Sequence, residues 1–128
     1  MTPPAIARWK TIAHSRDAAE LDALLADDVV FTSPVVHTPQ RGKAITTKYL
    51  AAALAVLGHE GFRYGEEWYG ETSAVLEFFT TIDGVEINGA DFIGWNADGR
   101  IDRFKVMVRP AKAMQAVQQA MGAKLAGG

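Results

Sequence analysis

Residues 70–110 read GETSAVLEFFTTIDGVEINGADFIGWNADGRIDRFKVMVRP, and they decide the fold because β-branched and aromatic runs alternate in them with short turns. Together with one run just before the stretch, they predict four strands, at about 60–69, 74–82, 86–95 and 100–109. The turns carry Asp83-Gly84 and Asn96-Ala97-Asp98-Gly99, whose residue types tolerate positive φ. Consecutive strands joined in this way form an antiparallel meander.

The chain before the meander has mainly helical spacing. Pro3 suits the first position of a helix, and apolar side chains recur at helical intervals over 6–13, over 21–25 and, on a wider face, over 45–57. Residues 29–32 are β-branched or aromatic, so they predict one short strand, which a proline-containing loop follows. Helices therefore precede the sheet along the chain.

The chain after the meander predicts one more helix. Pro110 ends the last strand, and Val117 and Met121 lie at helical spacing within a C-terminal helix at about 111–125. This order indicates the α+β class, with helices packed on one face of the sheet. The length suits a single domain over residues 1–128.

Composition excludes several classes of protein. Thirteen Lys and Arg residues face fifteen Asp and Glu residues without a basic cluster, so nucleic acid is not an expected partner. No run of about 20 apolar residues predicts a membrane span, and the N-terminus lacks the pattern of a secretion signal. Cysteine is absent, which fits a cytoplasmic protein.

The strands of the meander are apolar on both faces. Val75 and Phe79 alternate with Leu76 and Phe78, where a solvated face would alternate apolar with polar residues. Helices would cover one face, so the other is expected to meet a second protein surface. We expect a homodimer through the outer sheet face. The residues near the centre of its interface would be Val75, Phe79, Phe92 and Met107.

Two stretches carry a resemblance to a known superfamily. Residues 25–34 with Gly42 and Tyr49, and later residues 91–101, resemble the nuclear transport factor two-like superfamily, in its SnoaL-like and ketosteroid isomerase-like branches. The resemblance implies a cone-shaped, curved mixed or antiparallel sheet wrapped round the N-terminal helices to form an apolar pocket. That superfamily includes isomerases, cyclases, epoxide hydrolases, dehydratases and non-enzymatic binders, so it implies fold more than function.

The resemblance places three positions of the ketosteroid isomerase site on this chain. Ser33 falls where the isomerase has its carboxylate base, and Trp9 falls where it has a hydrogen-bonding tyrosine. Asp91 matches the aspartic acid of the isomerase's oxyanion hole. In the isomerase, an apolar site keeps that acid neutral so that it can donate a hydrogen bond. The Asp-Arg-Asp pattern of limonene-epoxide hydrolases is missing from the corresponding residues 76–80. Steroid isomerase activity is therefore not expected.

Asp91 is the leading candidate for a catalytic residue. Period-two counting puts it on the face of Ile93 and Trp95, where burial without a nearby cation is expected to raise its pKa. Two other interpretations stay open at this point. The carboxyl is a structural hydrogen-bonding group, or a one-residue change of register exposes it to solvent.

The remaining candidates are a loop histidine and a set of pocket residues. His37 lies in the loop that should form the mouth of the cone, as a second catalytic candidate or as a solvated surface residue. The residues expected to contact substrate are Trp9, Ser33, Tyr49, Trp68, Phe78, Trp95 and Val108. Aromatic residues at these spacings also suit a plain core. No metal is expected, because no histidine pair has ligand spacing, and no cofactor is implied.

Two functions follow from these residues. The first is a pocket for a small hydrophobic, carbonyl-bearing ligand, with acid-base chemistry of the isomerase, cyclase or lyase type. In it Asp91 donates a hydrogen bond to a developing oxyanion, and Trp9, Tyr49 or His37 orients the ligand. The second is a non-catalytic binding or dimerisation module, in which Asp91 is structural and side chains fill the cavity. A cavity smaller than a few ring atoms would favour the second.

Overall fold

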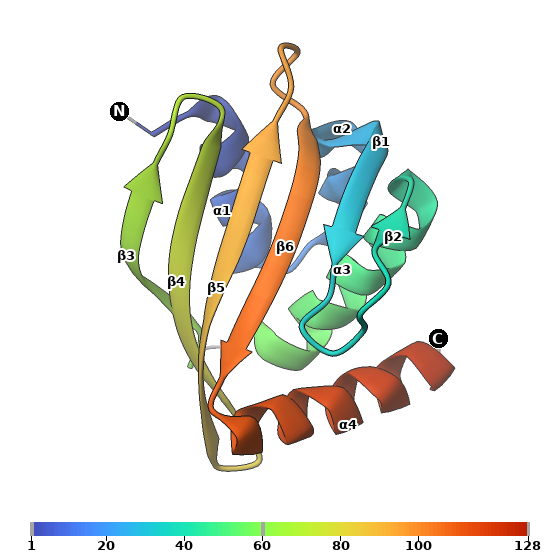
Figure 1. Ribbon diagram of the computed structural model, residues 1–128, viewed down its shortest axis with the longest axis vertical. Coiled ribbons are helices and arrows are strands. Elements are labelled where there is room, and N and C mark those ends of the chain that lie inside the picture. Colours follow the sequence, from blue (N-terminus) through green and yellow to red (C-terminus); the bar gives the residue numbers. More distant parts are fainter. Residues whose placement is uncertain (1, 60, 128) are drawn as a thin grey trace.

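The sheet of this protein has six strands in the order β2-β1-β6-β5-β4-β3 (Figure 1). The computed structural model describes residues 2–59 and 61–127. The strands are β1 (Leu25–Thr32), β2 (Gln40–Arg41), β3 (Arg63–Tyr69), β4 (Ser73–Ile82), β5 (Val85–Trp95) and β6 (Ile101–Arg109). β1 and β6 run parallel, whereas the other neighbouring strands are antiparallel. The α+β class and the curved mixed sheet are thereby confirmed.

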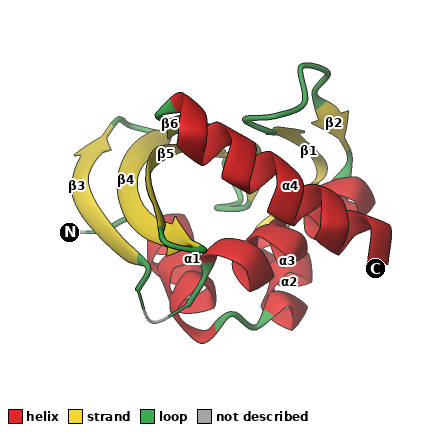
Figure 2. Ribbon diagram, turned by 90° about the horizontal axis from the view of Figure 1, so that it is seen from below, coloured by secondary structure: helices red, strands yellow, loops and turns green. Residues whose placement is uncertain are grey.

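The helices pack on the concave face and across one end of the sheet. They are α1 (Pro4–Ser15), a short 3-10 helix (Ala18–Glu20), α2 (Leu21–Leu24), α3 (Lys43–Leu57) and α4 (Ala111–Gly127). Figure 2 shows β3, β4 and β5 curving around α1, with α4 running from the end of β6 toward the side of the view away from β3. α1 buries Ile6, Trp9 and Ile12 toward the sheet, as its apolar spacing predicts. Among the described helices, none is both long and apolar enough for a membrane span.

Some element boundaries differ from those that the sequence predicts. Residues 21–25 do not form one helix, because Leu25 already belongs to β1 and pairs with Ile101, both fully buried. Sheet pairing at a buried position therefore overrides the helical spacing. The loop after β1 contains β2, a two-residue strand. β3 begins at Arg63, and the start predicted at Glu60 lies outside the described residues.

The strand register aligns four residues across the concave face. Asp91 on β5 is opposite Leu76 on β4 and Val106 on β6. Leu76 is in turn opposite Glu67 on β3. Directly opposite residues share one face of a sheet, so these four side chains form one row. We call Glu67, Leu76, Asp91 and Val106 the central row.

Candidate functional site

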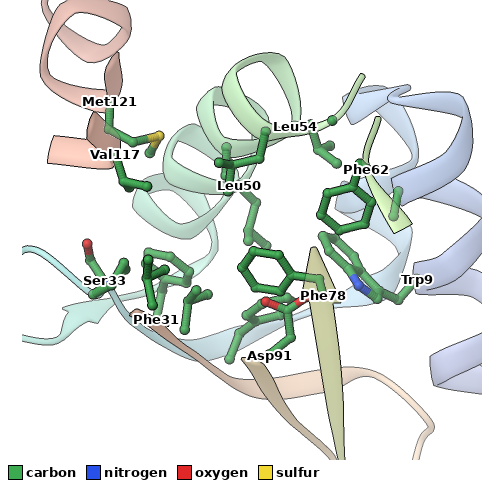
Figure 3. A pocket seen from close by; sticks show the side chains of 18 of the residues that line it. Trp9, Phe31, Ser33, Leu50, Leu54, Phe62, Phe78, Asp91, Val117 and Met121 are labelled. Carbon is green, nitrogen blue, oxygen red and sulfur yellow. The ribbon is translucent and has the colours of Figure 1, made fainter. Parts of the chain in front are cut away.

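A narrow pocket lies between the concave face of the sheet and the helices. Trp9 of α1, Leu50 of α3 and Val117 of α4 enclose it from three helices, and Phe31 and Phe78 line it from the sheet (Figure 3). The central row contributes Asp91 and Val106 to the lining. Most of the lining is apolar. The side chains in it that carry polar atoms are Trp9, Ser33, Tyr64 and Asp91.

The free space in this pocket is small, with a volume of about 60 Å³. Pockets for drug-sized ligands typically hold roughly 300–1,000 Å³, and a cavity of about 150 Å³ is known to hold benzene. A rigid polycyclic ligand therefore does not fit unless side chains move. Met121 of α4 lies in the wall, and a methionine side chain adapts its shape easily.

Three side chains in the wall form a hydrogen-bond relay. The indole Nε1–H of Trp9 donates to the Tyr64 hydroxyl oxygen over 2.8 Å. The Tyr64 hydroxyl donates to Oδ2 of Asp91 over 2.6 Å. The relay joins α1, β3 and β5, so it fixes the orientation of the carboxyl through two elements that are distant in sequence. Since the Trp9 N–H is engaged by Tyr64, Trp9 contributes its ring face to the pocket.

Burial makes Asp91 a weaker acid than an ordinary aspartate. The residue is 6% exposed, and burial raises its pKa from 3.8 to about 7, against the opposing effect of the Tyr64 hydrogen bond. Burial, followed by the charge of Asp91, raises the Tyr64 pKa well above its ordinary value, so Tyr64 stays protonated and donates. Near neutral pH the carboxyl is thus present in both forms. The neutral form has a proton that Oδ1 can offer to a ligand.

The structure brings five of the candidate residues together. Asp91, Trp9, Ser33, Phe78 and Val108 all line the pocket. The alternative that a register change exposes Asp91 is wrong, since Asp91 is buried. It has a structural partner and a pocket-facing position at the same time.

Two aromatic candidates require correction because they face elsewhere along the sheet. Trp68 is 52% exposed and lies opposite Val75 on the outer face, because the register shifts between Tyr64 and Glu67. Trp95 lies at the end of β5 and packs against the core beyond the pocket.

Tyr49 and His37 also lie outside the lining. The ring of Tyr49 packs against Phe31, which is itself in the wall, at 5.5 Å between centroids. His37 is exposed in the loop after β1 and is not among the residues around the pocket. The expectation that this loop carries a catalytic group into the pocket is therefore not met.

Tyr64 is the functional candidate that sequence reasoning missed. It follows Phe62 by two residues, and both line the pocket, so period-two spacing at the start of β3 was the available signal. The neighbouring Arg63, Gly65 and Glu66 are polar or small and exposed, so the stretch does not stand out as a buried strand. Within residues 2–59 and 61–127, no three His, Cys, Asp or Glu side chains are grouped as metal ligands would be.

Comparisons with known proteins give both a family and a fold. A family model described as SnoaL-like domain matches residues 6–104. A steroid delta-isomerase from Pseudomonas aeruginosa is 37% identical, with a TM-score of 0.91, over 96% of this chain and 90% of that chain. An uncharacterized protein with a cystatin-like fold from Silicibacter pomeroyi DSS-3 is 31% identical, with a TM-score of 0.89, over 96% of this chain and 86% of that chain.

A more distant structure shares the fold alone. It is the epoxide hydrolase/cyclase-like enzyme SalBIII of pyran ring formation in salinomycin, at 15% identity and a TM-score of 0.68. The alignment covers 82% of this chain and 88% of that chain. No curated protein matches the sequence.

Proposed function

This chain belongs to the SnoaL-like domain family, and we propose that it binds a small hydrophobic carbonyl compound and acts on it by acid-base chemistry. The observation that carries the proposal is one buried carboxyl, Asp91, in an otherwise apolar pocket with an elevated pKa. Perturbed acids in apolar pockets are typical of functional sites. The steroid delta-isomerase among the similar structures adds a precedent for isomerisation in this fold.

The relay prepares Asp91 to donate. Tyr64 occupies Oδ2, so the proton of the neutral acid is free to lie on Oδ1 and to bond a ligand carbonyl oxygen. That hydrogen bond strengthens as negative charge develops on the oxygen, which lowers the barrier. Asp91 is the one carboxyl among the described lining residues. The chemistry it supports is a proton transfer that begins and ends at this group, as in an isomerisation, a cyclisation or an elimination.

A titration with a simple ketone tests this proposal. We expect 2-octanone to shift the amide NMR signals of residues around the pocket and to raise the thermal unfolding temperature. Asp91→Leu removes the donor and should weaken binding at least roughly tenfold. Asp28→Leu is the matched control, because Asp28 is exposed on β1. Equal affinity in wild type and Asp91→Leu would refute the role of Asp91.

The pocket volume favours one alternative function. Free space of about 60 Å³ suits a module whose cavity is filled by its own side chains, with Asp91 as a structural partner of Tyr64. Such a module binds no ketone at millimolar concentration. In that case Asp91→Asn leaves every measured property except pH-dependent stability unchanged.

The outer face of the sheet supports a further proposal, a homodimer. Met107 is 51% exposed and Trp68 is 52% exposed, beside the half-buried Val75 and Phe92. Exposed aromatic and thioether side chains grouped on one face are typical of protein interfaces. Phe79, also expected at the centre, is covered by the Arg63 guanidinium at 4.2 Å. A cytoplasmic location remains a prediction from the absence of cysteine.

Sedimentation of the purified protein tests the dimer. We expect wild type to sediment as a dimer at micromolar concentration and Phe92→Lys to sediment as a monomer or to precipitate. Thr81→Lys is the control, because Thr81 is already exposed near the end of β4. A monomeric wild type would remove the proposal.

A further inference from the structure

Ser33 and Asp91 flank the same residue on the concave face. β1 runs parallel to β6 with Thr32 opposite Lys105, so the next residue, Ser33, comes beside Val106. Val106 is also the partner of Asp91 on the opposite side. Neighbouring strands lie about 4.8 Å apart, so the two backbones are separated by roughly 10 Å. Ser33 therefore extends the central row beyond Val106.

Both groups accept a hydrogen bond from the protein and keep a hydrogen to donate. The Ser33 hydroxyl oxygen accepts the Val35 backbone N–H over 3.1 Å, which leaves its own hydrogen for another acceptor. Asp91 accepts from Tyr64, and its neutral form has one proton to donate. Both residues are buried and line the pocket. Figure 3 shows Ser33 on the side of Phe31 and Val117, away from Asp91, which lies near Phe78 and Trp9.

We propose that the pocket selects a slender ligand with two hydrogen-bond acceptors, one bonded by Asp91 and the other by Ser33. The proposal deepens the proposed function, on which it rests, by naming the class of ligand: an unbranched dicarbonyl compound or a keto ester. The apolar surface between the two donors, which includes Val106, contacts the carbon chain. The small free volume disfavours bulky rigid rings, whereas a narrow flexible chain is accommodated when the adaptable Met121 side chain in the wall shifts. Acceptors roughly 5–10 Å apart suit the donor spacing.

A pair of matched ketones tests the second donor. Dissociation constants of 2-octanone and 2,7-octanedione are measured by NMR titration at pH 6, for wild type and variants. A symmetric diketone binds a single donor twofold more tightly on statistical grounds alone. The second hydrogen bond should add roughly 3- to 10-fold beyond that factor in wild type. Ser33→Ala should reduce the advantage of the diketone to about twofold, the statistical factor, because removing one of the two donors weakens the diketone more than 2-octanone.

Ser15→Ala is a close control. The Ser15 hydroxyl also accepts a backbone N–H two residues later, from Asp17 over 3.2 Å, but it lies at the end of α1 outside the pocket lining. This variant should keep the full advantage of the diketone. A wild-type advantage of twofold or less, or an unchanged advantage in Ser33→Ala, overturns the inference while leaving the proposed function intact. Failure of both ketones to bind wild type overturns the proposed function and this inference with it.

Discussion

Two carboxyl groups in the central row, Asp91 and Glu67, have pKa values shifted in opposite directions although their local arrangements are nearly the same. They flank Leu76 on either side, and each accepts a hydrogen bond from a tyrosine hydroxyl, Asp91 from Tyr64 and Glu67 from Tyr69. The pKa of Asp91 rises to about 7 because of burial. Burial also raises the pKa of Glu67, but hydrogen bonds from Lys10 and Tyr69 outweigh it, and the net pKa falls below 4.5.

The difference shows what a tyrosine partner does and does not do. A neutral hydroxyl does not keep a fully buried carboxyl ionised, whereas Lys10, at 2.5 Å from Glu67, supplies the opposite charge at the sheet edge. The described lining around Asp91 contains no lysine or arginine. The pocket therefore holds an acid that changes protonation near neutrality, and the edge holds a carboxylate that stays charged.

The largest expected effect concerns Ser33, which extends the central row beyond Val106 and could be replaced by a third carboxyl. We expect wild type to isomerise Δ5-3-ketosteroids at a rate not far above background, because Ser33 has no basic group and the pocket has little free space. A positioned base contributes roughly 10²- to 10⁴-fold in rate. The absorbance of the conjugated enone product gives the rate. Efficient turnover by wild type would contradict the prediction.

Ser33→Asp separates the two reasons given for that expectation. If the missing base limits the rate, the variant gains turnover toward the steroid. If the free volume limits it, the variant remains inactive although it carries a carboxyl beside Val106.

The second prediction compares the stability of Asp91→Asn and Glu67→Gln across pH. Asp91 has a folded pKa of about 7 above its ordinary 3.8, so its stabilising effect is complete below about 3.8 and is lost as pH rises through 7. The loss amounts to about 4 kcal/mol. Asp91→Asn should therefore flatten the stability profile between pH 5 and 8 and be the more stable protein at pH 8. Denaturant unfolding at both pH values measures this.

Glu67→Gln should change the pH dependence of the free energy of unfolding in the opposite direction. The folded pKa of Glu67 is lowered, so its contribution is present above 4.5 and is lost as pH falls through the folded value. A profile of wild type that is already flat between pH 5 and 8 would show that Asp91 is ionised throughout.

The third prediction tests how Tyr64 affects Asp91. Tyr64→Phe removes the donor to Asp91 and leaves the Trp9 N–H without its acceptor, so the free energy of unfolding at pH 5 should fall by roughly 1–3 kcal/mol. The Asp91 pKa should rise above about 7, because the Tyr64 hydrogen bond lowers it. Carboxyl NMR titration measures this shift. Tyr69→Phe is the control and should leave the Asp91 pKa unchanged, so an equal shift in both variants would refute the relay.

The smallest effect is expected at the sheet edge. Lys10→Met removes the cation beside Glu67, so the pKa of Glu67 should rise, and the free energy of unfolding should change by less than about 1 kcal/mol, because the Lys10 side chain is 35% exposed. NMR titration of Glu67 measures the first effect and denaturant unfolding the second. A loss of stability as large as that of Tyr64→Phe would remove the contrast between edge and pocket.

The meander was predictable from sequence because its turns and alternation are local signals. β4 and β5 begin and end within about a residue of the predicted limits, and alternation along β5 placed Asp91 on the concave face correctly. Such alternation does not hold along the whole of β3. Its register shifts between Tyr64 and Glu67, so Trp68 leaves the face of Tyr64.

The relay was beyond any local signal. Trp9 and Tyr64 are 55 residues apart, and Tyr64 and Asp91 are 27 apart, so their contact depends on how sheet curvature brings three elements together. The resemblance to ketosteroid isomerases places Trp9, whose N–H is a donor, where the isomerase has a hydrogen-bonding tyrosine. The structure directs that N–H to Tyr64 instead.

One wall of the pocket lies outside the part of the chain that the family model covers. That model ends at residue 104, whereas Val117 and Met121 of α4 close the pocket from the C-terminal segment. For protein engineering, α4 is therefore an exchangeable wall. Chimeras that take this segment from relatives, or libraries at these two positions, would sample new cavity shapes while the buried acid and its relay stay in place.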